Sequence, residues 1–193
     1  MPLRVIAGTA RGMKLKRVPG ANTRPITDRV KEALFNIIGA DIRGARFLDL
    51  FAGTGSVGIE ALSRGADYAH FNEVDPRAIK TIRQNLALTR LEDRARVTRR
   101  DAFYLIARKP ERLFHFIFVA PPQYRGIWLD TLHAIDRNAH WQHADSRIVV
   151  QIDPSEFYGN QRFAHLDLID KRQYGRTMLL FYRFVARSED FQS

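Results

Sequence analysis

Strands and helices alternate along residues 45–152, and this alternation constrains the fold more than any other feature. The stretches that predict strands are 45–51, which is short and buried, and 67–74, 94–100, 114–120 and 146–152. The stretches with helical periodicity are 56–65, 76–88, 102–108 and 125–136. The last stretch, 162–185, contains two strands about Tyr174-Gly175, which predicts an antiparallel hairpin. The whole pattern predicts an α/β fold, a mostly parallel sheet with helices on both faces.

A different pattern precedes this alternation. Residues 1–26 mix short apolar pieces with Gly and Pro, which predicts hairpin-like strands or an ordered loop. Residues 27–39 predict a helix that begins at Thr27 or Asp28 and ends at Gly39. The apolar side chains of this helix share one face: Val30, Leu34, Ile37 and Ile38.

Positive charge is concentrated at the N-terminus. The chain carries a net charge of +10, and residues 1–31 contain eight Lys and Arg residues against a single acid, Asp28. A basic segment joined to a domain whose charges nearly cancel is typical of a protein that binds nucleic acid. The alternative is a solvated N-terminal arm that keeps the protein in solution. We therefore expect a basic extension of residues 1–40, packed on a domain of residues 41–193, to contact RNA.

Composition excludes several classes of protein. No apolar run approaches the roughly 20 residues of a membrane helix, and no signal-peptide core is present at the N-terminus. The absence of cysteine excludes disulfides and thiolate chemistry, and it removes the commonest structural ligands of zinc. We therefore expect a cytoplasmic monomer that has no metal and no membrane partner.

A glycine pattern follows the first predicted strand. Residues 49–58, DLFAGTGSVG, fit G-x-G-x-x-G with Gly53, Gly55 and Gly58. This spacing lets the backbone pass close to a ligand between a strand end and a helix N-terminus. The pattern fits a nicotinamide dinucleotide or another nucleotide-like cofactor, and its structural explanation is a tight turn with close helix packing.

The next two strand ends carry acids. Ligands of open parallel sheets bind beyond the carboxyl ends of the strands. Glu73 comes 20 residues after Gly53, where an acid accepts hydrogen bonds from ribose hydroxyls. Asp75 is equally explained as a helix cap. Asp101 with the Ala102 N–H can recognise an adenine, or Asp101 can cap the next helix.

Two consecutive prolines, Pro121 and Pro122, follow the fourth predicted strand. They fix the backbone and remove two N–H donors, which leaves rigid carbonyls suited to holding an amine. A dinucleotide dehydrogenase explains only the first two strand ends. S-adenosylmethionine, which has an adenine, a ribose and a charged amino-acid tail, explains all four. We therefore predict S-adenosylmethionine as cofactor, with its methionyl part at Gly53 and Gly55 and its ammonium near Asp49.

Longer motifs resemble a known family over nearly the whole chain. They are RVIAGTARGMKL (4–15), TRPITDRVKEALFNIIG (23–39), FLDLFAGTGSVGIEALSRGA (47–66), NEVDPRA (72–78) and DAFYL (101–105). In these motifs the sequence is similar to the bacterial guanine-N2 methyltransferases that act on small-subunit (16S) rRNA. The resemblance implies a Rossmann-like class I methyltransferase fold, with a seven-stranded sheet and an antiparallel final hairpin. It also implies S-adenosylmethionine as donor and small-subunit rRNA, or a partly assembled small subunit, as substrate.

The resemblance and the charge pattern together give two sets of candidate residues. The candidates for cofactor binding are Asp49, Phe51, Gly53, Gly55, Glu73, Asp101 and Ala102. The candidates for RNA binding are Arg4, Arg11, Lys14, Arg17, Arg24 and Arg29.

The sequence departs from the family at the predicted catalytic loop. The family commonly has Asp-Pro-Pro followed by Tyr or Phe, whereas this chain has Ala120, Pro121, Pro122 and Gln123, with Tyr124 next. In the usual arrangement the acid and a carbonyl accept hydrogens from the exocyclic amine, and the aromatic ring stacks on the flipped base. The candidates left here are backbone carbonyls, the Gln123 amide oxygen and the Tyr124 ring. Loss of one acceptor predicts activity reduced on the order of 10²–10³-fold rather than abolished.

Two other functions stay open. N6-adenine DNA methyltransferases share the proline motif, but the basic N-terminal motifs argue against that class. An rRNA-binding assembly factor with weakened catalysis is favoured by Ala120 alone.

Overall fold

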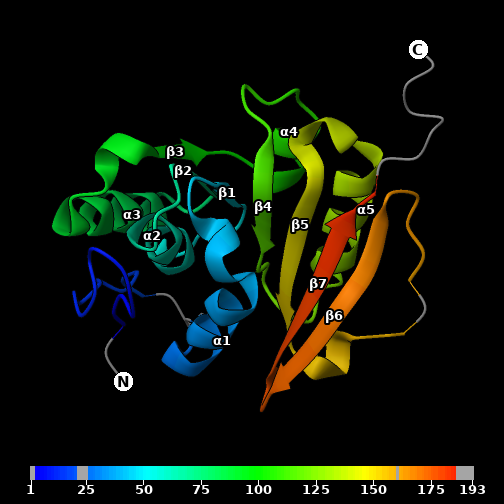
Figure 1. The fold of residues 1–193 in the computed structure, drawn as a ribbon, viewed down its shortest axis with the longest axis horizontal. Coiled ribbons are helices and arrows are strands. Elements are labelled where there is room, and N and C mark those ends of the chain that lie inside the picture. The colour runs from blue at the N-terminus through cyan, green and yellow to red at the C-terminus, as the bar shows by residue number, and fades with distance from the viewer. Residues whose placement is uncertain (1–2, 21–25, 160, 186–193) are drawn as a thin grey trace. The chain divides into compact units, whose positions relative to one another are not determined.

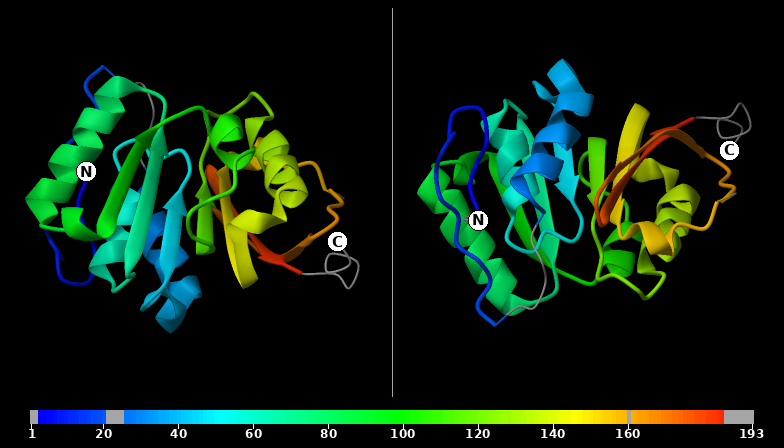
Figure 2. Two further views of the ribbon diagram at one scale, coloured as in Figure 1. Left: turned by 90° about the horizontal axis from the view of Figure 1, so that it is seen from above. Right: turned by 90° about the horizontal axis from the view of Figure 1, so that it is seen from below.

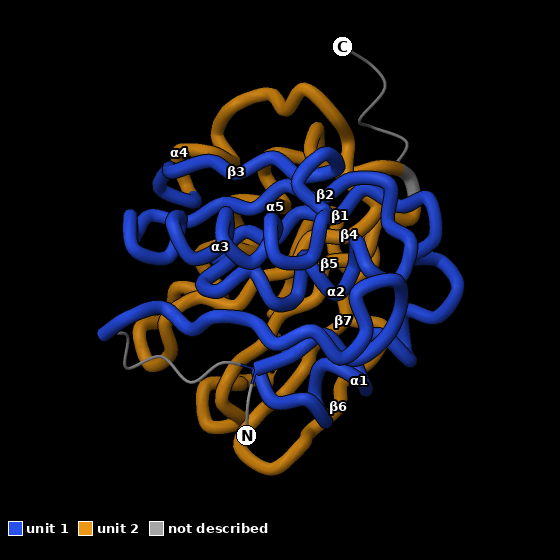
Figure 3. Tube along the Cα trace, turned by 90° about the vertical axis from the view of Figure 1, so that its left-hand side faces the viewer, with its two compact units in different colours: residues 1–102 blue, residues 103–193 orange. Residues whose placement is uncertain are grey.

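The computed structural model describes residues 3–20, 26–159 and 161–185. The chain forms two compact units, residues 1–102 and 103–193, which Figure 3 shows in two colours. The predicted division into an RNA-contacting extension of residues 1–40 and a methyltransferase domain of residues 41–193 stays a prediction.

Unit 1 is built on three parallel strands in the order β3-β2-β1. The strands are β1 (Arg46–Asp49), β2 (Tyr68–Glu73) and β3 (Ala95–Arg99). Helix α2 (Ser56–Ser63) connects β1 to β2, and α3 (Pro76–Thr89) with a short turn, η2 (Glu92–Arg94), connects β2 to β3 (Figure 1). Because the strands are parallel, Asp49 and Glu73 both lie at the carboxyl edge of this sheet, as the sequence predicts.

The N-terminal part of unit 1 is an ordered loop followed by a helix. Residues 3–20 form no strand, and one antiparallel bridge joins Arg4 to Lys14. This loop runs alongside α3 (Figures 1 and 2). Its buried apolar side chains are those of Leu3, Val5, Ala10, Leu15 and Val18. The Val5 N–H donates to the Met13 carbonyl and the Leu15 N–H donates to the Leu3 carbonyl, so residues 3–5 and 13–15 pair like a short hairpin within an ordered loop. Each of the two predicted alternatives therefore describes part of this segment.

Helix α1 (Asp28–Ile38) begins and ends as predicted. The Thr27 side chain accepts a hydrogen bond from the Val30 N–H, and Gly39 ends the helix with φ of 65° before a short turn, η1 (Gly39–Ile42). The predicted buried face is wrong in one position, because Ile37 is half-exposed. The buried face is Val30, Lys31, Leu34, Phe35 and Ile38.

Unit 2 has four strands in the order β4-β5-β7-β6. They are β4 (Phe114–Val119), β5 (Gln142–Ile152), β6 (Leu166–Tyr174) and β7 (Thr177–Phe184). The β4–β5 pair is parallel, and β7 pairs antiparallel with both β5 and β6. The remaining elements are α4 (Ala102–Ile106), whose first residue is the last of unit 1, α5 (Ile127–Arg137), η3 (Ala139–Trp141) and η4 (Pro154–Glu156).

The seven strands and their directions confirm the predicted fold class, including the final hairpin, which turns at Gly175 with φ of 60°. The largest boundary error is at β5, which begins at Gln142 rather than at residue 146. Its first residues are polar, and the pairing with β4 shifts register between Phe114 and Phe116. That part of the strand therefore has no regular apolar alternation by which a sequence pattern can be recognised.

Candidate cofactor and catalytic sites

The glycine loop connects β1 to α2, and its glycines serve two different purposes. Gly53 and Gly55 have φ of 55° and 76°, a region in which side chains are strained. A Cβ on Gly58 would lie 2.3 Å from a ring carbon of Phe71, so Gly58 allows α2 to pack closely on β2. A Cβ on Gly53 would meet nothing within 4 Å. The helix-packing explanation therefore holds for Gly58, whereas Gly53 leaves open space that a ligand can use.

Glu73 fixes this loop from the end of β2. One carboxylate oxygen, Oε2, accepts a hydrogen bond of 2.8 Å from the Gly53 N–H. The other, Oε1, accepts from the N–H groups of Val74 and Asp75 at 2.7 Å and 3.1 Å. The structure thus brings together the two residues that the 20-residue spacing predicts to be close. A carboxylate accepts about four hydrogen bonds, so Glu73 keeps acceptor capacity for a ligand hydroxyl.

Asp49, the last residue of β1, lies beneath the loop. Its side chain is buried, at 1% exposure, and Oδ2 accepts a hydrogen bond of 3.0 Å from the Gly58 N–H. Burial raises the pKa of this carboxyl to about 7, and the negative charge of Glu73 adds to the rise while the Gly58 hydrogen bond opposes it. Asp49 thus anchors the first turns of α2 and titrates near neutral pH.

This pKa predicts how Asp49 affects stability. Because the folded-state pKa lies above the ordinary value of 3.8, the native state holds the proton more tightly between about pH 4 and pH 7. Ionisation across that window therefore destabilises the fold. We expect Asp49→Asn to raise the melting temperature at pH 8 and to raise it much less at pH 5. Thermal unfolding at the two pH values measures this, with the exposed Asp67→Asn as control; an equal change at both values would contradict it.

One further acid and one amide lie at the strand ends of unit 1. Asp75 accepts from the Arg77 N–H at 2.8 Å and caps α3, which confirms the helix-cap explanation. Asn72 was not predicted as a site residue. Its Nδ2 donates to the carbonyl oxygens of Leu50 and Arg100, and its Oδ1 accepts from Thr98. Asn72 therefore ties together the ends of β1 and β3.

The remaining cofactor candidates follow those two strand ends. Phe51 comes directly after Leu50 and is half-exposed. Asp101 comes directly after Arg100 and is exposed, and Ala102 is the buried first residue of α4. The Asn72 hydrogen bonds thus bring these segments to the same edge of the sheet as the glycine loop.

The basic loop of residues 3–20 is held by a buried acid that the sequence analysis missed. Both carboxylate oxygens of Glu60, on α2, accept backbone hydrogen bonds, from Ile6 at 2.8 Å and from Ala7 at 3.0 Å. Lys31 lies 3.4 Å from Glu60, and neither side chain is exposed. The Lys31 ammonium also donates to the Arg4 carbonyl oxygen at 2.6 Å. This loop is therefore a packed part of unit 1 and not a solvated arm.

A buried amide connects the same loop to the glycine loop. Asn85, on α3, accepts from the Lys16 N–H at 2.7 Å and donates to the Lys16 carbonyl at 3.1 Å. It also donates to the Thr54 carbonyl at 2.9 Å. One side chain thus fixes the basic loop and the glycine loop against each other.

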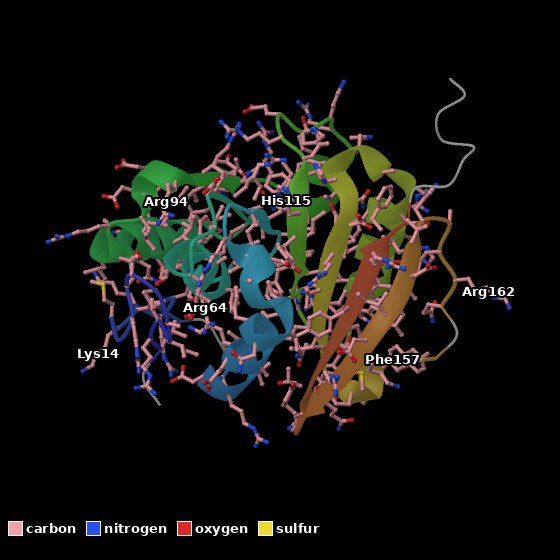
Figure 4. All side chains as sticks on the ribbon, in the orientation of Figure 1. Lys14, Arg64, Arg94, His115, Phe157 and Arg162 are labelled. Carbon is pink, nitrogen blue, oxygen red and sulfur yellow. The ribbon has the colours of Figure 1, made fainter. Side chains whose placement is uncertain are left out.

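The RNA-binding candidates differ in what they contact. Arg4 forms an ion pair of 2.8 Å with Asp28. Arg24 lies outside the described residues. The others are exposed on the surface: Arg11, Lys14, Arg17 and Arg29. Figure 4 shows Lys14 pointing outward from the loop, so the packed backbone of this segment presents basic side chains to solvent.

The catalytic candidates occupy the loop between β4 and α5 in unit 2. Ala120 is half-exposed and Pro121 is buried, whereas Pro122, Gln123 and Tyr124 are exposed. The Tyr124 side chain is 60% exposed, while its hydroxyl forms a hydrogen bond of 2.8 Å with Asp153. An aromatic face is thus available two residues after the proline pair.

Two features are absent from residues 3–20, 26–159 and 161–185. Among these residues there is no cluster of three or more His, Asp or Glu that could hold a metal ion. No helix of the described chain has the length and apolarity needed to cross a membrane.

The strand order, the glycine loop and the acid at the end of β2 define an α/β fold of the S-adenosylmethionine-dependent methyltransferase class. The family described as "Conserved hypothetical protein 95" matches residues 3–183, and the chain belongs to this family. This membership confirms the predicted relationship to rRNA methyltransferases and the predicted cofactor, S-adenosylmethionine.

Named relatives agree with this assignment. A "Putative rRNA methyltransferase YlbH" of Bacillus subtilis is 40% identical over 183 residues, which cover 94% of this chain and 98% of that one. The "Ribosomal RNA small subunit methyltransferase D" of Escherichia coli is 38% identical over 149 residues, which cover 77% of this chain and 74% of that one. Among solved structures, a "Putative methyltransferase yhhF" from Escherichia coli superposes with a TM-score of 0.83 at 34% identity, covering 97% of this chain and 100% of that one.

Proposed function

We propose that this protein transfers a methyl group from S-adenosylmethionine to the exocyclic N2 amine of a guanine in small-subunit rRNA. The observation that carries the proposal is the exposed Tyr124 ring, which is separated from the Pro121-Pro122 pair by Gln123 alone and follows the carboxyl end of β4. Relatives that are named as small-subunit rRNA methyltransferases support the substrate class. We further propose that the enzyme works as a monomer in the cytoplasm, on free rRNA or on a partly assembled small subunit.

The residues of unit 1 fit the cofactor. S-adenosylmethionine supplies a methyl group on a positively charged sulfur, next to an amino-acid tail, a ribose and an adenine. The open space at Gly53 admits the tail, and Glu73 accepts hydrogen bonds from the ribose hydroxyls. Asp101 and the Ala102 N–H recognise the adenine. Because Asp49 is buried and bonded to Gly58, it acts on the ammonium through water or through the loop that it anchors.

The residues of unit 2 hold the acceptor amine. The amine donates hydrogen bonds to the backbone carbonyls of Ala120 and Pro121 and to the Gln123 amide oxygen. Because these bonds orient the amine, its nitrogen lone pair is freed from conjugation with the ring. Tyr124 stacks on the flipped base, as aromatic residues do in enzymes of this kind. The acid usual at position 120 is absent, so catalysis depends mainly on positioning the amine.

Chromatography with mass spectrometry of rRNA nucleosides tests this function directly. A strain that lacks the gene is compared with the same strain carrying it again. We expect one N2-methylguanosine of small-subunit rRNA to disappear and to return. A change in N6-methyladenine of DNA would instead support the DNA methyltransferase, and unchanged nucleosides with defective subunit assembly would support the assembly factor.

The exposed basic residues of the N-terminal loop give a separate prediction. If Arg11, Lys14 and Arg17 contact phosphates, replacing all three with alanine removes about three ionic contacts. The slope of log K against log salt for RNA binding should then fall in magnitude by about 2, since each contact to a single strand contributes about 0.7. Filter binding over a salt series measures the slope, and calorimetry should show unchanged cofactor affinity.

A matched triple variant in unit 2 serves as the control for this experiment. It replaces three exposed arginines outside the N-terminal loop: Arg137, Arg162 and Arg172. Equal salt slopes for the two triple variants would show that the basic residues of the N-terminal loop make no specific contacts with RNA phosphates.

A further inference from the structure

Tyr124 has an unusual backbone conformation. Its φ is 62°, and only three non-glycine residues of the described chain have a positive φ: Arg90, Tyr124 and Asp145. A bulky residue adopts this region when its surroundings impose it, and such strain is concentrated at functional sites. The contacts that hold Tyr124 in this conformation therefore indicate the function of the loop between β4 and α5.

Three side chains from two other segments hold Tyr124. Its hydroxyl donates to Asp153 at 2.8 Å, and its backbone N–H donates to Glu156 at 2.8 Å. The Arg176 guanidinium donates to the Tyr124 hydroxyl oxygen at 3.1 Å and lies 3.6 Å from the Asp153 carboxylate. Both ends of Tyr124 are thus fixed, while 60% of its side chain stays exposed.

The topology of unit 2 explains why these residues meet. Val119, the last residue of β4, pairs with Val150 in the parallel strand β5, so the segments after β4 and β5 leave the sheet at the same edge. Ile152 of β5 pairs with Met178 of the antiparallel strand β7, which places the β6–β7 turn with Arg176 at that edge too. Ligands of parallel sheets bind at this edge.

The two acids are themselves firmly placed. Asp153 is buried and accepts from the Ser155 N–H at 3.0 Å and from the Ser155 hydroxyl at 2.8 Å. These bonds, with that from Tyr124, hold the pKa of Asp153 at about 2, so it is an ionised acceptor throughout the neutral range. Glu156 is also buried, and its Oε1 has no hydrogen-bond partner among the described residues.

We propose that Asp153 and Arg176 are positioning residues that orient the Tyr124 ring for the methyl-acceptor base. In the pattern usual for the family, the aromatic residue follows the two prolines directly and inherits their rigidity. Here Gln123 intervenes, and the contacts from Asp153, Glu156 and Arg176 supply the missing rigidity. This inference rests on the proposed function, because it takes Tyr124 as the ring that stacks on the base.

Steady-state methylation of small subunits with the full chain tests the proposal. Tyr124→Phe keeps the ring and loses only the hydroxyl, and Asp153→Ala removes the acceptor. Each should lower kcat/KM for the RNA substrate about tenfold, without changing KM for S-adenosylmethionine. The double variant should be no worse than either single variant, since both changes break the same contact. Asp153→Asn keeps an acceptor oxygen and should recover part of the loss.

Two controls separate positioning from general damage. Asp170→Ala removes a half-exposed acid of the same unit, paired with Arg172 on β6, and should leave kcat/KM unchanged. Melting temperatures identify any variant that loses activity through unfolding, and Tyr124→Phe remains informative because it leaves the Asp153 contacts to Ser155 in place.

Two results would overturn the proposal, and they are distinguishable. Additive losses in the double variant, or full activity of Tyr124→Phe while Tyr124→Ala is impaired, would show that the ring is oriented without Asp153. A wild-type protein inactive on every small-subunit preparation would refute the proposed function itself, and this inference with it.

Discussion

Replacing Glu60 with alanine is expected to lower the free energy of unfolding by about 3–5 kcal/mol, the effect of leaving a buried charge without its partner. The Lys31 ammonium would stay buried with only the Arg4 carbonyl to accept from it, and the Ile6 and Ala7 N–H groups would lose their acceptor. Burial already lowers the pKa of Lys31, so the ammonium depends on Glu60 to remain charged. Denaturant unfolding followed by circular dichroism measures the loss.

The matched control for this change is Glu32→Ala, an exposed acid next to Lys31 on α1. It should alter stability by less than about 0.5 kcal/mol, as surface substitutions usually do. The double variant Lys31→Met with Glu60→Leu should recover part of the loss, because an apolar pair of similar size avoids the unpaired charge. Equal stability of the Glu60→Ala and Glu32→Ala variants would show that the basic loop does not depend on the buried pair.

Glu73→Ala is expected to weaken binding of S-adenosylmethionine, or of its demethylated product, by about 10–100-fold. A hydrogen bond to a charged group contributes about 1.5–3 kcal/mol, and the ribose hydroxyls would lose such an acceptor. The variant also releases the Gly53 N–H, so the glycine loop loses its support from β2. Isothermal titration calorimetry with S-adenosylhomocysteine measures the change.

Asp75→Ala is the control, since this neighbouring acid caps α3 and is not assigned to the cofactor. It should cost about 1 kcal/mol of stability, as loss of a helix cap does, and should leave cofactor affinity unchanged. Binding of NAD by the wild-type protein with no response to S-adenosylhomocysteine would refute the cofactor assignment, and equal affinities in the Glu73 and Asp75 variants would refute the role of Glu73.

The elements that the sequence determined by itself depend on local patterns. The alternation of strands and helices, the Thr27 cap of α1 and the Tyr174-Gly175 turn were predicted correctly, because periodicity, capping and turn chemistry involve residues close along the chain. The proximity of Gly53 and Glu73 was also predictable, since a strand, a helix and a second parallel strand return the chain to the same edge of the sheet.

Only the tertiary structure decided which polar residues are buried and what they contact. Lys31 and Glu60 each lie in a helix where a charged residue is ordinarily solvated, and they meet because α1 and α2 pack together around the N-terminal loop. Asn85 reaches Lys16 across 69 residues of sequence, and Tyr124 reaches Arg176 across 52. The partners of a buried polar group depend on which segments pack together, and local periodicity carries no information about that. The sequence therefore predicts where a site lies, whereas tertiary packing determines the contacts that hold it.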